Sequence, residues 1–264
     1  PTSDLMRANR DGESWVRVDP LCFDALIEAF AAHRRTHGRF DPRVLADLVR
    51  LGYDVSWTRQ QPRVADVDRA LSGRAPLAPW QPEFRAATCE VKVGPHPIDL
   101  GGIGKGLAVR WASGRLRANG LSNYFVEAGG DVACAGVPAD APGWRVSVED
   151  PLGGSEPVAV LELCDEAAAT SSVRLRSWRV GGRKVHHLID PRTGEPGGDG
   201  LLAVTVADPD PARAEVWSKV LFLTGRTGVA TTAALYNLPA LWVDTEGALG
   251  ASAALGRRLI WSSG

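Results

Sequence analysis

The first third of the chain carries two stretches in which apolar residues are spaced three or four positions apart. The longer one covers residues 21–35, and Asp19 precedes Pro20 in the arrangement that is typical of a helix start. A turn that contains glycine and proline ends this stretch, and residues 44–51 repeat the pattern over a shorter length. We predict two helices here, followed by an exposed connection over residues 58–82 that contains one or two helical turns.

Short alternating segments predominate from residue 85 onward. Residues 85–93 alternate toward a strand, whereas residues 107–118 and 212–223 have the spacing of helices. Further strands are predicted, several joined by short turns that contain glycine, at 124–128, 132–136, 144–149, 158–163, 178–180, 185–189, 202–206 and 241–243. These strands follow one another too closely for repeated βαβ crossovers. The pattern therefore predicts an α+β fold with a largely antiparallel sheet and packed helices.

Length and composition suit one large domain or two closely packed lobes, because 264 residues of which 44% are hydrophobic can bury a substantial core. The formal net charge is −1 and no basic run is present, so neither nucleic acid nor an anionic membrane is expected as a partner. We expect a single domain over residues 1–264.

No apolar stretch approaches the roughly 20 residues of a membrane span, and the first residues lack the pattern of a signal peptide. These features predict a soluble chain without a membrane span, and they favour the cytoplasm over the cell envelope. Pro1 is not an initiator residue, so the sequence leaves open whether a leader or anchor precedes it.

Residues 98–106 form a glycine cluster, Ile-Asp-Leu-Gly-Gly-Ile-Gly-Lys-Gly, between a predicted strand end and a predicted helix start. Free backbone N–H groups and the helix dipole favour an anion at such a place. The cluster is not a P-loop, because Gly106 follows Lys105 where that motif has serine or threonine, and its glycine spacing is not that of the dinucleotide fingerprint. A tight turn that needs glycine only for its backbone angles is the alternative.

Two more clusters follow. Residues 127–131 place a glycine pair between two predicted strands, and residues 186–194 read His-His-Leu-Ile-Asp-Pro-Arg-Thr-Gly, ending a predicted strand in an Asp-Pro turn. Histidine exchanges protons near neutral pH. Because neighbouring residues of a strand point to opposite faces, we expect at most one of the two histidines to serve a site. Taken alone, the pattern favours a structural role for either histidine.

In their residues and in their order along the chain, the three clusters resemble motifs of the ApbE family of flavin transferases. These motifs read D-L-G-G-I-A-K-G-Y, A-G-G-D and H-I-I-D-P-x-T-G. The corresponding residues here are 99–107, 128–131 and 187–194. Upstream, residues 3–9 resemble the family's S-E-L-S-R-L-N, and residues 36–42 resemble its T-D-G-x-F-D-P. The resemblance spans nearly the whole chain. It implies one ApbE-like (T-fold-like) domain that lacks the family's N-terminal strand and helix.

The resemblance also implies an activity, namely the transfer of FMN from FAD to a threonine hydroxyl of a target protein with release of AMP. FAD or FMN and a flavin-accepting protein are then the partners. Two alternatives remain open at this point. The same fold can bind FAD without chemistry, or it can act as an FAD pyrophosphatase in which water replaces the threonine.

Site residues follow from the resemblance by position. Asp99, Gly102 and Lys105 are implied to face the pyrophosphate of FAD, and His187 is implied to be the catalytic acid or base. Further contacts to the cofactor, partly through the main chain, are implied for Arg39, Phe40, Asp41 and Ile189.

Magnesium is implied as a second cofactor, but the helix that supplies its ligands departs from the family pattern A-D-A-L-A-T-A-L-F-V-L-G. Residues 214–225 have Glu215 in place of the aspartate and Lys219 in place of the threonine, which leaves Gly102 and Glu215 as implied ligands. A lysine ammonium has no lone pair for a metal. One hypothesis is that Lys219 places its own charge beside the pyrophosphate, so that flavin binds without a divalent ion. The alternative is an ordinary surface pair with Glu215.

Overall fold

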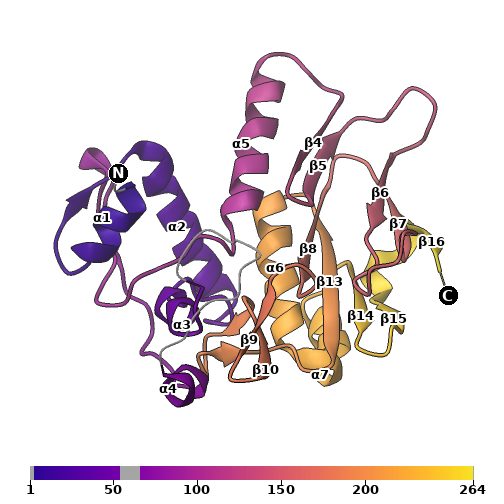
Figure 1. Ribbon diagram of the computed structural model, residues 1–264. Helices are drawn as coiled ribbons and strands as arrows, with labels where there is room; N and C mark the ends of the chain where they lie inside the picture. The colour runs from indigo at the N-terminus through magenta and orange to yellow at the C-terminus, as the bar shows by residue number, and fades with distance from the viewer. Residues whose placement is uncertain (1–2, 54–65, 264) are drawn as a thin grey trace. The chain divides into compact units, whose positions relative to one another are not determined.

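The computed structural model describes residues 3–53 and 66–263 of the chain (Figure 1). The chain forms two compact units, each made of two separate stretches. Unit 1 comprises Pro1–Gly101 and Ser177–Pro196, and unit 2 comprises Gly102–Arg176 and Gly197–Gly264. The first stretch of unit 1 thus ends at Gly101, inside the glycine cluster, and the chain returns to unit 1 over Ser177–Pro196. The single domain expected from the sequence stays a prediction.

The first predicted helix is present in unit 1 as α2 (Pro20–Arg35), and its start is as predicted. The Asp19 side chain accepts a hydrogen bond from the Leu21 N–H at 2.9 Å. Phe23 and Leu26 point into the core, while the Leu21 side chain is exposed. The other helices of unit 1 are α1 (Asp4–Arg10), α3 (Leu45–Arg50) and α4 (Val67–Leu71).

The single strand predicted at residues 85–93 is wrong, because this segment lies across an antiparallel hairpin. A 3₁₀ turn, η1 (Ala86–Thr88), and Cys89 in a left-handed conformation reverse the chain, so that Arg85 pairs with Glu90. The three-stranded sheet has the order β1-β3-β2. Its strands are β1 (Val16–Arg17), β2 (Glu83–Arg85) and β3 (Glu90–Lys92).

Residues 177–196 return to unit 1 as two short hairpins, and the first of them completes a hydrophobic core against α3 and α4. Trp178 and Val185 pack there against Leu51 and Ala70. The Trp178 indole N–H also donates to the Leu51 carbonyl oxygen at 2.7 Å. The strands are β9 (Ser177–Val180), β10 (Arg183–His186), β11 (Ile189–Asp190) and β12 (Glu195–Pro196).

Unit 2 is built on a six-stranded sheet with the order β15-β14-β13-β8-β5-β4, in which all neighbouring strands are antiparallel. This confirms the predicted α+β class. Helices α5 (Gly104–Ala118) and α6 (Pro211–Leu223) pack on one face, and the small sheet of order β16-β7-β6 lies on the other (Figure 1). Strand β5 is buried on both sides, since Ala133 contacts the core beneath α5 while Val132 and Cys134 face Leu161.

The remaining elements of unit 2 match most of the predicted strands to within a few residues. They are β4 (Tyr124–Ala128), β5 (Asp131–Ala135), β6 (Trp144–Val148), β7 (Ala159–Leu163), β8 (Ala167–Ser172), β13 (Leu201–Asp208), α7 (Gly225–Leu235), β14 (Ala240–Asp244), β15 (Leu249–Ala251), η2 (Ala253–Arg258) and β16 (Leu259–Ser262). Within the two ranges that the structure describes, no helix has the length and apolar character of a bilayer span.

Helix α5 begins three residues earlier than predicted, and the strand expected before the glycine cluster is an irregular segment over residues 93–100. Gly104 and Gly106 therefore lie in the first helical turn. A Cβ atom on Gly106 would lie 2.5 Å from the carbonyl oxygen of Pro211, so glycine is needed for the close approach of α5 to α6. This part of the cluster has a packing reason beside any role in binding.

Candidate functional site

Three of the motif segments meet in unit 1. The Asn9 side chain binds both backbone groups of Ile98, donating from Nδ2 to its oxygen at 2.8 Å and accepting from its N–H at 2.9 Å. The next residue, Asp99, donates its N–H to the Pro42 oxygen at 2.7 Å. Asp99 Oδ1 then accepts from the Gly101 N–H at 2.7 Å and bends the chain into the glycine turn. These bonds fix where the glycine cluster starts.

The Arg39-Phe40-Asp41 segment is mostly committed to the structure of unit 1. The Phe40 side chain is buried, and Asp41 accepts two hydrogen bonds from Arg43, from Nε at 3.0 Å and from Nη2 at 2.6 Å. His33 Nδ1 lies 3.5 Å from the same carboxylate. We refer to His33, Asp41 and Arg43 as the unit 1 cluster. Arg39 alone of the predicted three has an exposed side chain.

A cavity of about 500 Å³ adjoins the unit 1 cluster. Its lining combines the apolar side chains of Phe30 and Trp80 with the polar side chains of Arg34 and Arg192. Burial lowers the pKa of His33, against the opposing effect of Asp41. The histidine is therefore neutral at physiological pH, and the cavity wall carries the charges of its arginines.

The histidine segment differs from its prediction. Strand β10 ends at His186, and His187 lies in a bend, so the argument that two neighbouring strand histidines face opposite sides was wrong for this pair. His186 Nδ1 accepts from the Leu188 N–H at 3.3 Å and so supports the bend. His187 is half-buried. The Ile189 side chain is buried in the core of unit 1, which leaves its main chain for any contact with a ligand.

Two arginines that the sequence did not single out hold the turn after Asp190. Arg50 donates to the Gly194 oxygen at 2.5 Å, and Arg74 donates to the Pro191 oxygen at 3.1 Å. Both guanidinium groups also pair with the buried carboxylate of Asp47. No local pattern predicts this arrangement, because the partners are far apart in the chain. These bonds fix the backbone of the turn that follows His187 in the chain.

In unit 2, Lys105 and Lys219 gather around two buried carboxylates. Lys219 Nζ lies 3.2 Å from Glu215 Oε1, and Lys105 Nζ lies 3.5 Å from the same oxygen. Lys105 also binds Asp131. We refer to these four residues as the unit 2 cluster. Glu215 and Asp131 are 1% exposed, whereas Lys105 and Lys219 are 32% and 18% exposed. The predicted contact of Glu215 with Lys219 is present, but the surface pair considered as its alternative is not.

The two carboxylates of the unit 2 cluster are in different electrostatic states. Burial raises the pKa of Glu215, but Lys219, Lys105 and the Gly106 N–H outweigh burial, and the net shift is downward. Gly106 N–H donates to Glu215 Oε2 at 2.8 Å. Burial and the nearby Glu215 raise the pKa of Asp131, against Lys105. Asp131 Oδ1 is buried without a hydrogen-bond partner. Glu215 is thus the firmly charged member of the pair.

The start of α5 has the chemistry that favours an anion. Ile103 makes no side-chain cap and Glu215 takes up the Gly106 N–H, so the N–H groups of Gly104 and Lys105 are those of the first turn that can serve a ligand, and the Lys105 ammonium adds a charge. Gly102 lies in the turn just before the helix and is half-exposed. In the part of the chain that the structure covers, no three His, Cys, Asp or Glu side chains are grouped as a metal site.

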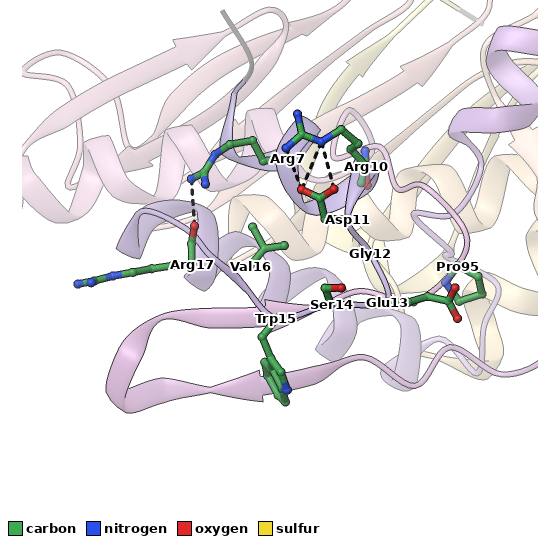
Figure 2. A pocket seen from close by; sticks show the side chains of 12 residues that line it. Arg7, Arg10, Asp11, Gly12, Glu13, Ser14, Trp15, Val16, Arg17 and Pro95 are labelled. Atoms are coloured by element: carbon green, nitrogen blue, oxygen red, sulfur yellow. Dashed lines mark hydrogen bonds and ion pairs between the residues drawn. The ribbon is translucent and has the colours of Figure 1, made fainter.

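A second hollow, of about 640 Å³, lies in unit 1 between residues 7–17 and the Gly94–Pro95 turn (Figure 2). Arg10 pairs with Asp11, and Arg7 donates to the Arg17 oxygen at 3.0 Å. None of the predicted site residues lines this hollow.

Comparison with known proteins relates the chain to flavin transferases. A Vibrio cholerae serotype O1 protein named FAD:protein FMN transferase is 31% identical over 246 residues, which are 91% of this chain and 72% of that protein. A Salmonella typhimurium protein of the same name is 30% identical over 129 residues, 48% of this chain and only 37% of that protein. The crystal structure of the ApbE protein from Thermotoga maritima matches with a TM-score of 0.80 and 29% identity, covering 95% of this chain and 82% of that one. The sequence profile of the ApbE family matches residues 1–242, and the chain belongs to this family.

Proposed function

We propose that the chain is an FAD:protein FMN transferase, which moves FMN from FAD to a threonine hydroxyl of a target protein and releases AMP. The names of its relatives support this activity. The physical observation that carries it is the start of α5, where backbone N–H groups and the ammonium groups of Lys105 and Lys219 lie together. Such a set of donors suits a diphosphate.

In the proposed reaction, the threonine oxygen attacks the phosphorus on the FMN side of the pyrophosphate. A new P–O bond forms to threonine, the P–O bond to the AMP phosphate breaks, and AMP leaves with that electron pair. The hydroxyl proton passes to a base, for which we propose His187. Alignment and charge neutralisation are the main needs of such a transfer. The turn that follows His187 in the chain is fixed, which favours alignment of the base, and Lys105 supplies positive charge.

The remaining predicted residues take supporting roles in this proposal. Asp99 and Gly102 shape the backbone that receives the pyrophosphate, since Asp99 bends the chain ahead of α5. Arg39 offers an exposed guanidinium to the cofactor. The side chains of Phe40, Asp41 and Ile189 are buried, and the Phe40 N–H and oxygen already bind Thr36 and His33, which leaves the main chains of Asp41 and Ile189 for contacts with the cofactor.

Magnesium at Gly102 and Glu215 is not supported by the side chains present. Both oxygens of Glu215 are engaged, one by the Gly106 N–H and the other by two ammonium groups. Lys219 stands where a ligand is expected and has no lone pair to offer. We therefore write the reaction without a metal-dependent step.

The proposal is tested by mixing the purified chain with FAD and with threonine-containing candidate acceptor proteins. AMP is followed by chromatography and covalent flavin by fluorescence in a denaturing gel. AMP together with a fluorescent acceptor is the expected result. AMP without covalent flavin would indicate a pyrophosphatase, and tight flavin binding without AMP would indicate a binding protein. Either of these two results would contradict the transferase assignment.

The role of His187 is tested by a matched pair of variants. His187→Gln should slow AMP release by about 10² to 10⁴-fold, the usual contribution of general acid–base catalysis. His186→Gln, one residue away, should retain most of the rate, because the proposed base is His187 and the His186 Nδ1 accepts a hydrogen bond from the Leu188 N–H. Equal losses in both variants would show that the bend itself, rather than the His187 imidazole, is what the reaction needs.

A further inference from the structure

The unit 2 cluster holds two ammonium groups against one carboxylate oxygen. Lys105 Nζ and Lys219 Nζ lie 3.5 Å and 3.2 Å from Glu215 Oε1. Two ammonium groups that approach the same oxygen repel each other unless a negative charge lies between them. Glu215 has that position, and its other oxygen is fixed by the Gly106 N–H of α5. The cluster therefore holds two ammonium groups in a fixed arrangement.

The same cluster is unsuited to a divalent cation at Glu215. An ion there would meet both ammonium groups at short range, and it would have to displace them from the oxygen that they share. Asp131 Oδ1 is the carboxylate oxygen of the cluster that lacks a partner, but its residue is 1% exposed and its second oxygen already binds Lys105. A hard cation such as Mg²⁺ prefers several oxygen ligands in a nearly regular octahedron.

We infer that Lys105 and Lys219 together supply the two positive charges that bind the flavin diphosphate, so that this chain binds FAD without a divalent cation. The inference rests on the proposed function for the identity of the ligand. Both lysine side chains are partly exposed, at 32% and 18%, so a ligand can approach them, while the two buried carboxylates hold them in place. Lys219 and Lys105 are binding residues in this assignment, and Glu215 is a positioning residue.

The test is a titration of the intact chain with FAD, followed by flavin and tryptophan fluorescence, in EDTA and in millimolar Mg²⁺. The expected result for the unchanged chain is the same Kd, within about twofold, in both solutions. If FAD binds only in the presence of Mg²⁺, the inference is overturned while the proposed function stands. If FAD does not bind in either solution, the proposed function falls together with the inference.

Two variants at one position separate charge from metal ligation. Lys219→Met keeps the length of the side chain and removes its charge, and we expect FAD to bind about 10- to 100-fold more weakly in both solutions. Lys219→Thr should show the same loss in EDTA and regain affinity in Mg²⁺, because a hydroxyl next to Glu215 can ligate the ion. Binding by Lys219→Met that equals the unchanged chain in EDTA would overturn the inference.

A control lysine excludes a general effect of charge. Lys92 pairs with Glu83 at 3.0 Å on the small sheet of unit 1, and Lys92→Met should bind FAD as the unchanged chain does. Thermal unfolding of each variant reports whether it is folded. The comparison of EDTA with Mg²⁺ on the unchanged chain needs no variant at all, so the inference remains testable even if Lys219→Met does not fold.

Discussion

The two units each contain a cluster of buried charges, and the clusters differ in how their carboxylates are occupied. In the unit 1 cluster, Arg43 binds both oxygens of Asp41 through two nitrogens, and both side chains are almost fully buried. In the unit 2 cluster, lysines bind Glu215 and Asp131, and the lysine side chains are partly exposed. We call the unit 1 cluster closed, because both partners are buried, and the unit 2 cluster open, because its lysine side chains are partly exposed.

The difference follows from the chemistry of the two cations. The planar fork of arginine matches a carboxylate in one geometry and leaves few donors for anything else. A lysine ammonium is a compact charge with three donors on a flexible stem, so it can bind a carboxylate and a ligand together. The unit 1 cluster thus fixes the shape of the loop around Asp41, while the lysines of the unit 2 cluster keep donors for the diphosphate proposed above.

The largest effect should come from breaking the closed cluster. Arg43→Met leaves the Asp41 carboxylate buried without its partner, and it should lower the free energy of unfolding by about 3 to 5 kcal/mol. Denaturant unfolding followed by tryptophan fluorescence measures this loss. Arg10→Met is the control, because the Arg10–Asp11 pair is exposed and its loss should cost less than about 1 kcal/mol. Equal losses would mean that the cluster of Arg43 is not specially stabilising.

A second change tests how closely the open cluster depends on helix packing. Gly106→Ala should destabilise by about 1 to 3 kcal/mol, since its Cβ would overlap the backbone of α6 and separate the Gly106 N–H from Glu215. Gly114→Ala in the same helix meets no atom within 4 Å and should stabilise by up to about 1 kcal/mol. Chemical denaturation of the two variants gives the comparison, and a stabilising Gly106→Ala would contradict the packing described here.

Neutralising the two carboxylates of the open cluster should change the free energy of unfolding in opposite directions. Glu215 has a lowered pKa, so its charge stabilises the fold above about pH 4.5 and this contribution is lost as the pH falls. Asp131 has a raised pKa, so its charge opposes folding as the pH rises through that pKa. At neutral pH in EDTA, Glu215→Gln should destabilise and Asp131→Asn should stabilise, each by about 1 to 2 kcal/mol. Unfolding curves at pH 7 and pH 4 test both signs.

The smallest effect concerns His33. Because its pKa is lowered from 6.5 in the folded chain, the unfolded chain binds more protons just below that pH, and stability should fall as the pH decreases through this range. In His33→Gln, the loss of unfolding free energy between about pH 6.5 and 5 should be smaller than in the unchanged chain, by less than about 1 kcal/mol. His96→Gln, at an exposed position, should leave the slope unchanged. Thermal unfolding at several pH values provides the measurement.

The sequence predicts features that depend on neighbouring residues. The start of α2 follows from Asp19 before Pro20, and the contact of Glu215 with Lys219 follows from their spacing on one helix. Both are present. The antiparallel sheet was also predictable, because its strands succeed one another closely along the chain.

Features made by distant residues were not predictable in the same way. Strand β8 lies inside the six-stranded sheet but consists of alanine, threonine and serine, which give no strong strand pattern. Its small side chains suit the contact with α6. The pair of Lys105 with Asp131 and the clamp of Arg50 and Arg74 join segments far apart in the chain, and no local signal indicates such partners.

The discontinuity of unit 1 has a consequence for how the chain is made. Leu48 of α3 and Leu51, the residue that follows the helix, are covered by Trp178 and Val185, which belong to the returning stretch. On the ribosome, roughly 5 to 20 residues emerge per second, so this apolar face waits for many seconds while the first part of unit 2 is synthesised. The nascent N-terminal segment is therefore a natural client for chaperones until residue 196 has left the exit tunnel.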